Sequence, residues 1–353
     1  MRVYVFNRGI SSNVGDKLIN YVITRDLQRQ GFSVRNNSEH YIPGGFFGNL
    51  RSHFISYLDD LYKVNGSDMV IIGGGNLIMD TRNVGIRWSI HQFWLSTICI
   101  VLRKPYYYVS VGVNPLQQYL SKVLYKFSLK NALGISARDS YSKSYIAELT
   151  GREDIRLVPD PVLNISKVVP VEITAKRKKY VGICPIQLYP KVTQDVNLHE
   201  KFISVNRGLI EVMLEMGYKV HVFINSLEDD KQTLVELSRD LYHEDLVIIP
   251  EFKTIFDYLD FIAKLDFLFS ARMHAVICAT SYKIPAIGFG WQPKMYHFFN
   301  DLGLSGYVNI LEDLNSKTKD ELVQVYSEAM RNSLVFSSNF IPPDFDLVSL
   351  ITH

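Results

Sequence analysis

Short apolar blocks and longer amphipathic blocks follow one another along most of the chain. Residues 68–72 are apolar after the first position, as in strands of a parallel sheet that is covered on both faces. Residues 117–129 instead carry apolar side chains at helical spacing, and a helix over 199–216 would end at Gly217. This pattern predicts strands and helices in alternation, which is typical of doubly wound α/β folds.

The alternation runs through two stretches of similar length. In the first stretch the predicted strands are 3–6, 32–35, 68–72, 105–111, 133–137 and 155–158. In the second stretch they are 180–186, 219–224, 245–249, 266–270 and 285–289, followed by helices over 293–302 and 317–332. Residues 36–52 contain several glycines and are predicted to form an inserted loop, with a lid as the alternative.

A length of 353 residues favours two domains over a single core. The alternation breaks over residues 164–179, which end in the basic cluster 176–179. The sequence therefore predicts four parts: an N-terminal Rossmann-like domain over 1–165 on the acceptor side, a linker over 166–179, a C-terminal Rossmann-like domain over 180–335 on the donor side, and a tail over 336–353 that packs back toward the first domain. The basic cluster is expected to be a solvated face, and peripheral contact with anionic lipid is the alternative.

Composition removes several function classes. A net charge of +2 does not support nucleic-acid binding by phosphate neutralisation. The cysteines lie in separate apolar runs without zinc or disulfide spacing, so we expect free thiols in a reducing cytosol and no metal site. The chain enters a strand at once, so we expect no signal peptide, and the apolar run 93–102 is too short to span a bilayer. A cytoplasmic protein, at most peripheral to the inner face of the membrane, is the expectation.

Cationic side chains follow the last predicted strands. The strand 266–270 leads into Arg272 and His274, and the strand 285–289 leads to Lys294. Open α/β sheets bind ligands beyond the carboxyl ends of their strands. Arginine forks onto carboxylate or phosphate, lysine supplies a point charge, and a helix that starts near Arg272 adds backbone donors. The pattern therefore predicts a site for an anionic ligand.

The first domain has polar strand ends of its own. Asn13 and Asp16 follow the first strand, Asn76 follows three glycines, and Arg138 follows the strand 133–137. Each has a plain structural alternative. Asp16 would more often cap a helix, Arg138 would pair with the adjacent aspartate at a helix start, and the glycines would only form a tight corner between strand and helix.

The histidines have plain alternatives too. His274 precedes apolar residues and would then be a core histidine with its hydrogen bonds satisfied. His91 and His297 each stand among aromatic residues, where packing is the default interpretation. Arg272 is harder to explain as structure alone, because an arginine so close to a buried strand must be paired.

An ordered set of these segments resembles the polysaccharide pyruvyltransferase family over roughly residues 1–305. The set carries the resemblance more than any single motif does, particularly Arg-x-His with the later lysine. Met273 stands where the family often has leucine. The segments are Asn13–Asp16, Ile72–Asn76, Val109–Gly112, Ile135–Asp139, Pro159–Pro161 and Ser270–His274, with Lys294.

The resemblance implies a GT-B-like fold with the active site in the cleft between two Rossmann-like domains. It also implies transfer of a pyruvyl group from phosphoenolpyruvate onto two hydroxyls of a sugar, with release of phosphate. The donor would contact Arg138, Arg272, Met273, His274 and Lys294. We expect the acceptor to contact Asn13, Asp16, Asn76 and His91. No cofactor is implied, since phosphoenolpyruvate is itself the donor substrate.

Several roles stay open on the sequence. His274 is either the acid that protonates the donor methylene or a hydrogen-bond donor to phosphate, and the base is either Asp16 or His91. The acceptor sugar, in a surface or capsular polysaccharide or in a lipid-linked precursor, would be chosen by residues 36–52 and 78–91. Two other functions compete: a GT-B glycosyltransferase that uses a nucleotide-sugar, and a non-catalytic glycan-binding protein. The sequence does not indicate an oligomeric state.

Overall fold

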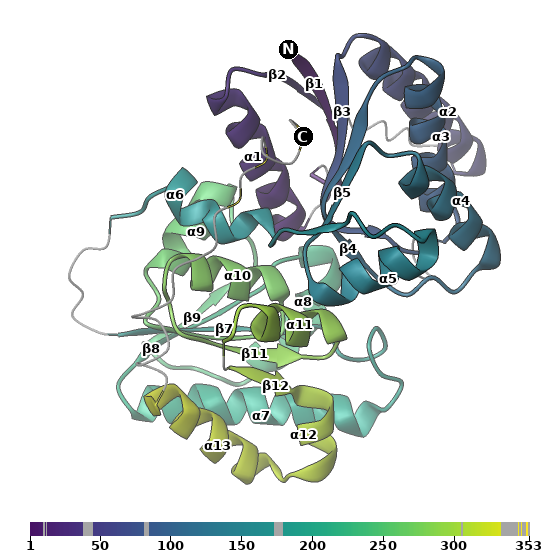
Figure 1. Ribbon diagram of the computed structural model, residues 1–353. Helices are drawn as coiled ribbons and strands as arrows, with labels where there is room; N and C mark the ends of the chain where they lie inside the picture. The colour runs from purple at the N-terminus through teal and green to yellow at the C-terminus, as the bar shows by residue number, and fades with distance from the viewer. Residues whose placement is uncertain are drawn as a thin grey trace. The chain divides into compact units, whose positions relative to one another are not determined.

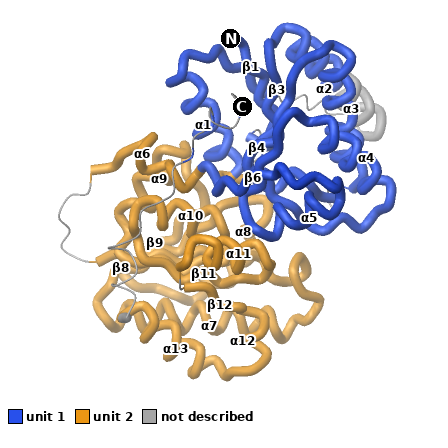
Figure 2. Tube along the Cα trace, viewed as in Figure 1, with its two compact units in different colours: residues 1–11, 16–161, 344–353 blue, residues 12–15, 162–343 orange. Residues whose placement is uncertain are grey.

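The computed structural model describes residues 1–9, 11, 13–37, 45–80, 85–172, 179–304 and 306–332, together with 345, 347 and 351; over 45–54 only the backbone is described. The chain forms two compact units, each built on one six-stranded sheet (Figures 1 and 2). All the strand pairings are parallel. Parallel strands need crossover helices, which is why strand and helix alternate in the sequence.

The first unit has the strand order β2-β1-β3-β4-β5-β6. Its strands are β1 (Arg2–Phe6), β2 (Ser33–Asn36), β3 (Met69–Ile78), β4 (Tyr106–Val113), β5 (Gly134–Ala137) and β6 (Arg156–Leu157). Its helices are α1 (Val14–Arg29), α2 (Gly45–Asn65), α3 (Arg87–Val101), α4 (Tyr119–Lys130) and α5 (Ser140–Thr150). The order reverses between β1 and β3, so the crevice at this switch point opens beyond their carboxyl ends.

Alternate residues of the first sheet pack against opposite layers. Tyr4, Val70 and Tyr108 belong to a core that also holds residues of α2, α3, α4 and α5. Tyr107 points the other way, and its hydroxyl donates to the carbonyl oxygen of Ile351 at 3.2 Å. Ile351, near the end of the chain, therefore packs on the first sheet, although it is far from that sheet in sequence.

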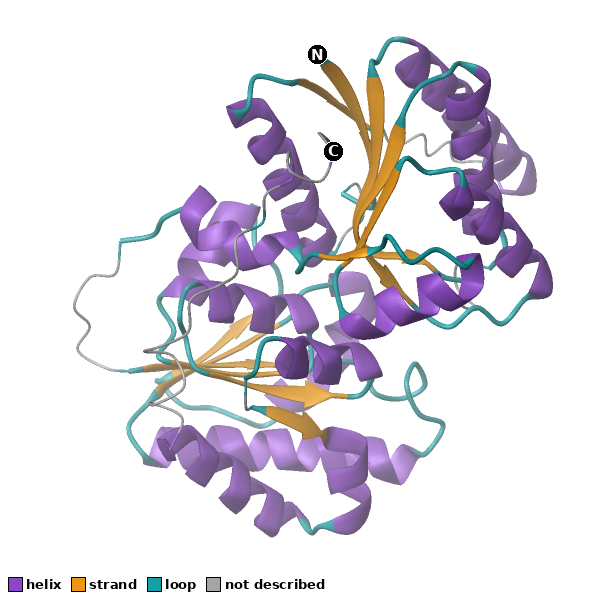
Figure 3. Cartoon of the chain, in the orientation of Figure 1, coloured by secondary structure: helices purple, strands orange, loops and turns teal. Residues whose placement is uncertain are grey.

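The second unit has the strand order β12-β11-β10-β7-β8-β9. Its strands are β7 (Tyr180–Cys184), β8 (Lys219–Phe223), β9 (Leu246–Ile249), β10 (Phe267–Ser270), β11 (Ala286–Gly290) and β12 (Tyr307–Asn309). Its helices are α6 (Ile165–Val168), α7 (Val196–Glu215), α8 (Leu227–Ser238), α9 (Ile255–Ala263), α10 (Met273–Ser281), α11 (Pro293–Asp301), α12 (Ile310–Ser316) and α13 (Lys319–Asn332), all visible in Figure 3. The order reverses between β7 and β10, which is the switch point of a Rossmann sheet.

The division into units, which is based on contacts between residues, differs from the predicted domain boundaries in two places. Residues 162–343 form the second unit, so the stretch expected to be a linker begins inside it. Asn13–Gly15 are also grouped with the second unit, while the rest of α1 belongs to the first. Residues 344–353 are grouped with the first unit.

Two local predictions were wrong. The glycines Gly73, Gly74 and Gly75 lie within β3 and form no corner between strand and helix. The φ angles of Gly74 and Gly75 are +81° and +76°, and a Cβ on Gly74 would lie 1.9 Å from the Ile19 side chain, so only glycine fits there. Residues 45–52 were predicted as loop but belong to α2, whose later turns carry the apolar spacing that anchors it; residues 38–44 lie outside the described residues.

Five elements of the described chain were not predicted at all: the helices α2, α6 and α12, the strand β12 and a 3₁₀ helix over Pro161–Asn164. The strand β12 is three residues long and only partly buried, so its sequence lacks the apolar run of the inner strands. None of the described helices is long and apolar enough to cross a membrane.

Candidate functional site

The second unit places Arg272 and His274 at its switch point. The strand β10 ends at Ser270, and the Ala271 amide then donates to the Cys184 carbonyl oxygen of β7 at 2.9 Å. Arg272 precedes α10 as its N-cap, with its amide donating to Ser270 Oγ at 3.0 Å. The extended residue before the helix thus turns its side chain out at the strand end, where this fold class binds ligands.

Arg272 is held by a buried carboxylate. Its Nε donates to Asp230 Oδ2 at 2.7 Å and its Nη2 donates to Asp230 Oδ1 at 2.5 Å, which is a bidentate fork. Burial works against the charge of Arg272, but the Asp230 carboxylate outweighs it and raises the pKa of the guanidinium. Burial raises the pKa of the fully buried Asp230, and Arg272 opposes that rise. The fork uses two of the five N–H donors of the arginine and fixes the direction of the others.

Asp230 connects the ends of three strands. It lies in the first turn of α8, the helix that follows β8. Its Oδ1 also accepts from the amide of Gln187, a residue that follows β7, at 3.0 Å. Gln187 in turn accepts a hydrogen bond from Thr233 Oγ1 at 2.7 Å through its Oε1. Arg272, at the end of β10, is therefore positioned by a network that spans β7, β8 and β10.

His274 packs against a glycine from the start of the chain. A Cβ on Gly15 would lie 2.1 Å from His274 Nδ1, so the imidazole rests directly on the Gly15 backbone. The Gly15 amide donates to Asn13 Oδ1 at 2.8 Å, and the Val14 amide donates to the Asn225 carbonyl oxygen at 3.2 Å. Gly15, within the predicted motif Asn13–Asp16, thus has a structural role, because its lack of a side chain leaves space for His274.

Lys294 reaches the same edge through Trp291. The indole Nε1 of Trp291 donates to the Ala271 carbonyl oxygen at 3.0 Å, next to Arg272. Lys294 Nζ lies 5.5 Å from the centre of the Trp291 ring, within the range of a cation–π contact. Met273, the remaining donor candidate of this unit, is buried with 7% exposure. The structure therefore brings Arg272, His274 and Lys294 to one edge of the second sheet.

Arg138 occupies a second cationic centre, in the first unit. Its Nη2 donates to Asn76 Oδ1 at 2.5 Å, and its side chain pairs with Asp139 at 3.3 Å and with Asp160 at 3.5 Å. Asp139 also caps α5 by accepting from the Ser142 amide, so the expected ion pair at a helix start is present. A Cβ on Gly112 would lie 2.6 Å from the guanidinium carbon, which explains a glycine between Asn76 and Arg138.

The other candidates of the first unit have local partners. Asp16 Oδ2 accepts from Ser11 Oγ at 2.7 Å and lies 3.6 Å from Arg8 Nε. Asn76 Nδ2 donates to Asn114 Oδ1 at 3.2 Å. Asp16 thus stands at the end of β1 and Asn76 at the end of β3, the two strands that flank the switch point of this sheet.

His91 belongs to a buried network. Its Nε2 lies 2.5 Å from Asp60 Oδ2, and Asp60 Oδ1 accepts from the Tyr4 hydroxyl at 2.5 Å. The ring also packs against Phe6 and Trp88. These contacts agree with the packing interpretation, and the acceptor role of His91 stays a prediction.

Asp230 is the residue that the sequence did not single out. It ends the run Glu228-Asp229-Asp230 in the first turn of a helix, where acidic residues normally offset the helix dipole. Nothing in that pattern distinguishes the one carboxylate that is fully buried. The buried Leu234, four positions later, indicates which face of the helix points inward, but the partner arginine lies far away in the sequence.

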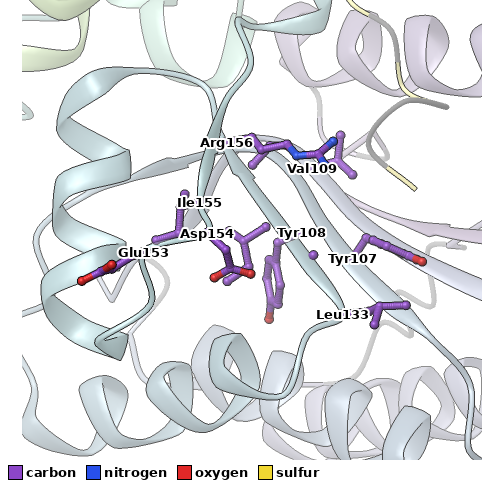
Figure 4. A pocket seen from close by; sticks show the side chains of 11 residues that line it. Tyr107, Tyr108, Val109, Leu133, Glu153, Asp154, Ile155 and Arg156 are labelled. Carbon is purple, nitrogen blue, oxygen red and sulfur yellow. The ribbon is translucent and has the colours of Figure 1, made fainter. Parts of the chain in front are cut away.

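Other features of the described residues do not form the site. A hollow of about 410 Å³ in the first unit is lined by residues of β4 and β5 and by residues 153–156, with the side chains of Tyr107 and Arg156 labelled in Figure 4. None of its lining residues is a predicted site residue. Within the described part of the chain, no cluster of three histidine, cysteine or acidic side chains is arranged to hold a metal ion.

The fold is shared with solved sugar enzymes. A UDP-GlcNAc 2-epimerase from Methanocaldococcus jannaschii matches with a TM-score of 0.62 at 12% identity, covering 100% of this chain and 99% of that one. The S. aureus MnaA–UDP structure matches with a TM-score of 0.61 at 11% identity, covering 99% and 93%. The UDP-GlcNAc 2-epimerase of Neisseria meningitidis bound to UDP-GlcNAc matches at 0.57 and 10%, covering 97% and 95%. At such identities these neighbours establish the GT-B fold alone.

Family membership comes from the sequence comparison. No curated protein matches the chain. The family model for polysaccharide pyruvyl transferase matches residues 13–293, which include Asn13, Arg138, Arg272 and His274. The predicted family and fold class are thereby confirmed: the chain belongs to the polysaccharide pyruvyl transferase family.

Proposed function

We propose that this protein transfers a pyruvyl group from phosphoenolpyruvate to two hydroxyls of one sugar unit and so forms a pyruvate ketal. The acceptor sugar would belong to a surface or capsular polysaccharide of the cell wall, or to a lipid-linked oligosaccharide precursor. The observation that carries the proposal is the edge of the second sheet, where Arg272, held by Asp230, stands beside His274 in a chain of this family.

Phosphoenolpyruvate needs a binding site with cationic side chains, such as this edge of the second sheet. Phosphoenolpyruvate carries a phosphate and a carboxylate, and a guanidinium whose orientation is fixed can fork onto either. We assign Arg272, His274 and Lys294 to donor binding, with Met273 as packing beneath them. Arg138 keeps the same proposed role in the first domain, where Asp139 and Asp160 balance its charge until the ligand arrives.

The chemistry balances without a further reactant. A proton adds to the methylene of phosphoenolpyruvate and makes C2 electrophilic, and the first sugar hydroxyl adds there. The C2–O bond to phosphate then breaks, and the second hydroxyl takes its place. One hydroxyl proton replaces the proton used at the methylene, and the other leaves with phosphate. A general acid and a general base are needed. We propose His274 for the donor end and Asp16 for the acceptor end, with Asn13, Asn76 and His91 as acceptor contacts.

Phosphate release tests the proposal. Wild-type protein with phosphoenolpyruvate and a panel of simple galactosides, mannosides and glucosides should release phosphate with at least one acceptor. Arg272→Ala and His274→Ala should each lower kcat/KM by about a hundredfold or more, because each removes an interaction with the reacting anion. Arg239→Ala and His243→Ala remove the same residue types from an exposed segment and serve as matched controls. Equal activity in all four variants would refute the site.

A nucleotide-sugar donor is the competing proposal. The GT-B fold alone is compatible with it. Thermal-shift measurements separate the two: phosphoenolpyruvate should raise the melting temperature of the wild type and not of Arg272→Ala. A shift with nucleotide-sugars and none with phosphoenolpyruvate would favour the glycosyltransferase.

A further inference from the structure

Acidic residues are missing from a long segment of the first unit. Residues 81–138 contain no aspartate or glutamate, although Asp80 and Asp139 flank them. The chain as a whole is nearly balanced, with 38 basic and 36 acidic residues, so this segregation is local. The basic residues of the segment are Arg82, Arg87, Arg103, Lys104, Lys122, Lys126, Lys130 and Arg138.

The helix α4 exposes an apolar strip beside a row of lysines. Tyr119, Leu120, Val123 and Phe127 are 82%, 51%, 43% and 38% exposed. At about 100° per residue they cover one arc of the helix surface. The exposed Lys122 and Lys126 lie in the arc next to it, and the exposed Lys130 lies in line with the apolar strip at the end of the helix. The opposite face, with Ser121, Tyr125, Ser128 and Leu129, is buried.

The apolar strip continues onto α3. The rings of Phe93 and Phe127 lie 5.0 Å apart, and the hydroxyls of Ser96 and Ser128 are hydrogen-bonded at 2.9 Å, so the two helices lie side by side (Figures 1 and 3). Outward from that contact α3 exposes Ile90, Trp94 and Val101, the last with 72% exposure. We call the exposed apolar residues of both helices the α3–α4 surface: Ile90, Trp94, Ile100, Val101, Tyr119, Leu120, Val123 and Phe127.

The neighbouring helix α2 adds exposed apolar side chains to this surface, and its nearby carboxylates are already paired. Trp94 packs against Tyr57 of α2, and α2 exposes Leu58, Leu61 and Tyr62. The carboxylates of this part of α2 are engaged: Asp59 pairs with Lys63 at 2.6 Å and Asp60 with His91.

A cationic hollow lies at the end of the α3–α4 surface. Its volume is about 570 Å³, and the described residues that line it include Arg103, Lys104, Lys130 and Arg152 and no carboxylate. Ile100 and Leu133, which also line it, are 41% and 63% exposed. A space lined by both apolar and basic side chains suits a phosphate group that is attached to an acyl chain. Arg152 is already paired with Asp154, so Arg103, Lys104 and Lys130 supply the charge.

We propose that the α3–α4 surface docks on a bilayer that contains anionic phospholipids. Apolar side chains enter the region between headgroups and acyl chains, and Lys122, Lys126, Lys130, Arg103 and Lys104 contact the phosphates. Charge favours a lipid surface over a second copy of this chain, because two such surfaces would bring like charges together. The proposal is independent of the proposed reaction, since it is tested without substrate.

Vesicle flotation tests the docking directly. The full chain is incubated with vesicles of phosphatidylcholine alone, or with about one-third phosphatidylglycerol, at low and at physiological salt. The wild type should float with the anionic vesicles and bind the neutral ones at least about tenfold more weakly, since each basic residue near such a surface favours binding.

Matched variants locate the surface. Lys122→Glu with Lys126→Glu should weaken binding to anionic vesicles by about tenfold or more, whereas Lys231→Glu with Lys253→Glu, an equal charge change on exposed residues of the second unit, should leave it nearly unchanged. Tyr119→Ser with Leu120→Ser should weaken binding at both salt concentrations. Their control is Tyr242→Ser with Val235→Ser, which alters residues of 93% and 47% exposure.

Two outcomes would overturn the proposal. The first is equal flotation of the α4 variants and their controls, or no preference of the wild type for anionic vesicles. The second is a dimer, seen by sedimentation equilibrium, that dissociates in Tyr119→Ser with Leu120→Ser and does not float with vesicles. That result would identify the α3–α4 surface as a contact between copies of the chain.

Discussion

Arg272 and Asp230 form the pair on which the donor edge depends. The carboxylate is fully buried and the arginine side chain is 19% exposed, so the carboxylate has no access to bulk water when the arginine is removed. Removing one partner of a buried pair leaves a desolvated charge, which costs more than the pair itself contributes. The effect of substitution is therefore larger than that of a surface ion pair.

A double-mutant cycle measures this coupling. Arg272→Ala and Asp230→Ala should each lower the free energy of unfolding in urea by about 3 kcal/mol, and the double variant should lose clearly less than the sum. The pair Arg152–Asp154, in which Asp154 is 62% exposed, is the control and should show a coupling below about 1 kcal/mol. Equal coupling in the two cycles would mean that Arg272 is not held as described.

The cysteines should be unreactive in the folded protein. Cys99, Cys184 and Cys278 are all buried, and none of them forms a disulfide. Burial, with a smaller contribution from Asp60, raises the pKa of Cys99 to about 12, and burial also raises the pKa of Cys184. All three thiols are buried, and a raised pKa also keeps Cys99 and Cys184 neutral. A maleimide should therefore label no thiol of the native protein between about pH 7 and 9 and all three in denaturant. Rapid labelling of native Cys99 would contradict the buried environment.

At the scale of an element, the start of α1 is shaped by the histidine of α10. Alanine is normally better than glycine within a helix by about 1 kcal/mol. At position 15, however, the new Cβ would overlap Nδ1, Cγ and Cβ of His274, so the substitution should lower both stability and activity.

Gly15→Ala should lower the melting temperature and should lower kcat/KM for phosphoenolpyruvate by about tenfold or more, because the imidazole must move. Gly66→Ala is the matched control, since its Cβ would lie 2.8 Å from the end of the Arg35 side chain and at an ordinary contact distance of 3.4 Å from the Tyr62 carbonyl oxygen. Full activity of Gly15→Ala, with an unchanged pH profile, would show that His274 does not need its present position.

The inner strands were predicted correctly from the sequence, whereas the edge strand β12 and the helix α2 were not. Inner strands such as β4 and β10 are buried at every position, so they appear in the sequence as continuous apolar runs. The strand β12 is exposed at Asn309 and lacks that signal, and α2 begins among glycines that usually mark loops. The continuation of β3 through three glycines depends on the packing of Ile19 against Gly74, which no local pattern contains.

The same distinction applies to the candidate site: some of its residues could be predicted from the sequence, and the residues that orient them could not. Strand ends can be located from a pattern, so Arg272, His274, Lys294 and Arg138 were predicted to contact an anion, and that role stays a prediction. The residues that orient them come from other parts of the chain: Asp230 for Arg272, and Gly15 for His274. Such pairs are set by the tertiary fold, and the sequence shows them only as an ordinary helix start and an ordinary loop glycine.

At the scale of the whole molecule, the end of the chain completes the first unit. Leu347 is fully buried, and Phe345 and Ile351 are 8% and 6% exposed. The Tyr107 hydroxyl bonds to the Ile351 carbonyl oxygen, so these residues pack on the sheet of the first unit. Its stability therefore depends on residues that are far in sequence from the strands they cover.

Leu347→Ala should lower the stability of the first unit by about 2–5 kcal/mol, as expected for a buried leucine. Leu157→Ala, at a position with 48% exposure in the same unit, should change it by less than about 1 kcal/mol. Hydrogen exchange of β1 and β3 amides reports the first unit separately, which matters because two units need not unfold together. Faster exchange only in the second unit of Leu347→Ala would contradict this packing.

The central claim is that phosphoenolpyruvate is the donor and a sugar ketal the product. Incubation of the protein with phosphoenolpyruvate and an acceptor panel, followed by mass spectrometry of the acceptor and assay of phosphate, tests it most directly. The predicted result is an acceptor whose mass rises by pyruvic acid less one water, with one phosphate released for each transfer and neither change with Arg272→Ala. Unchanged phosphoenolpyruvate across the panel, with sugar transfer from a nucleotide-sugar by the same preparation, would contradict the account.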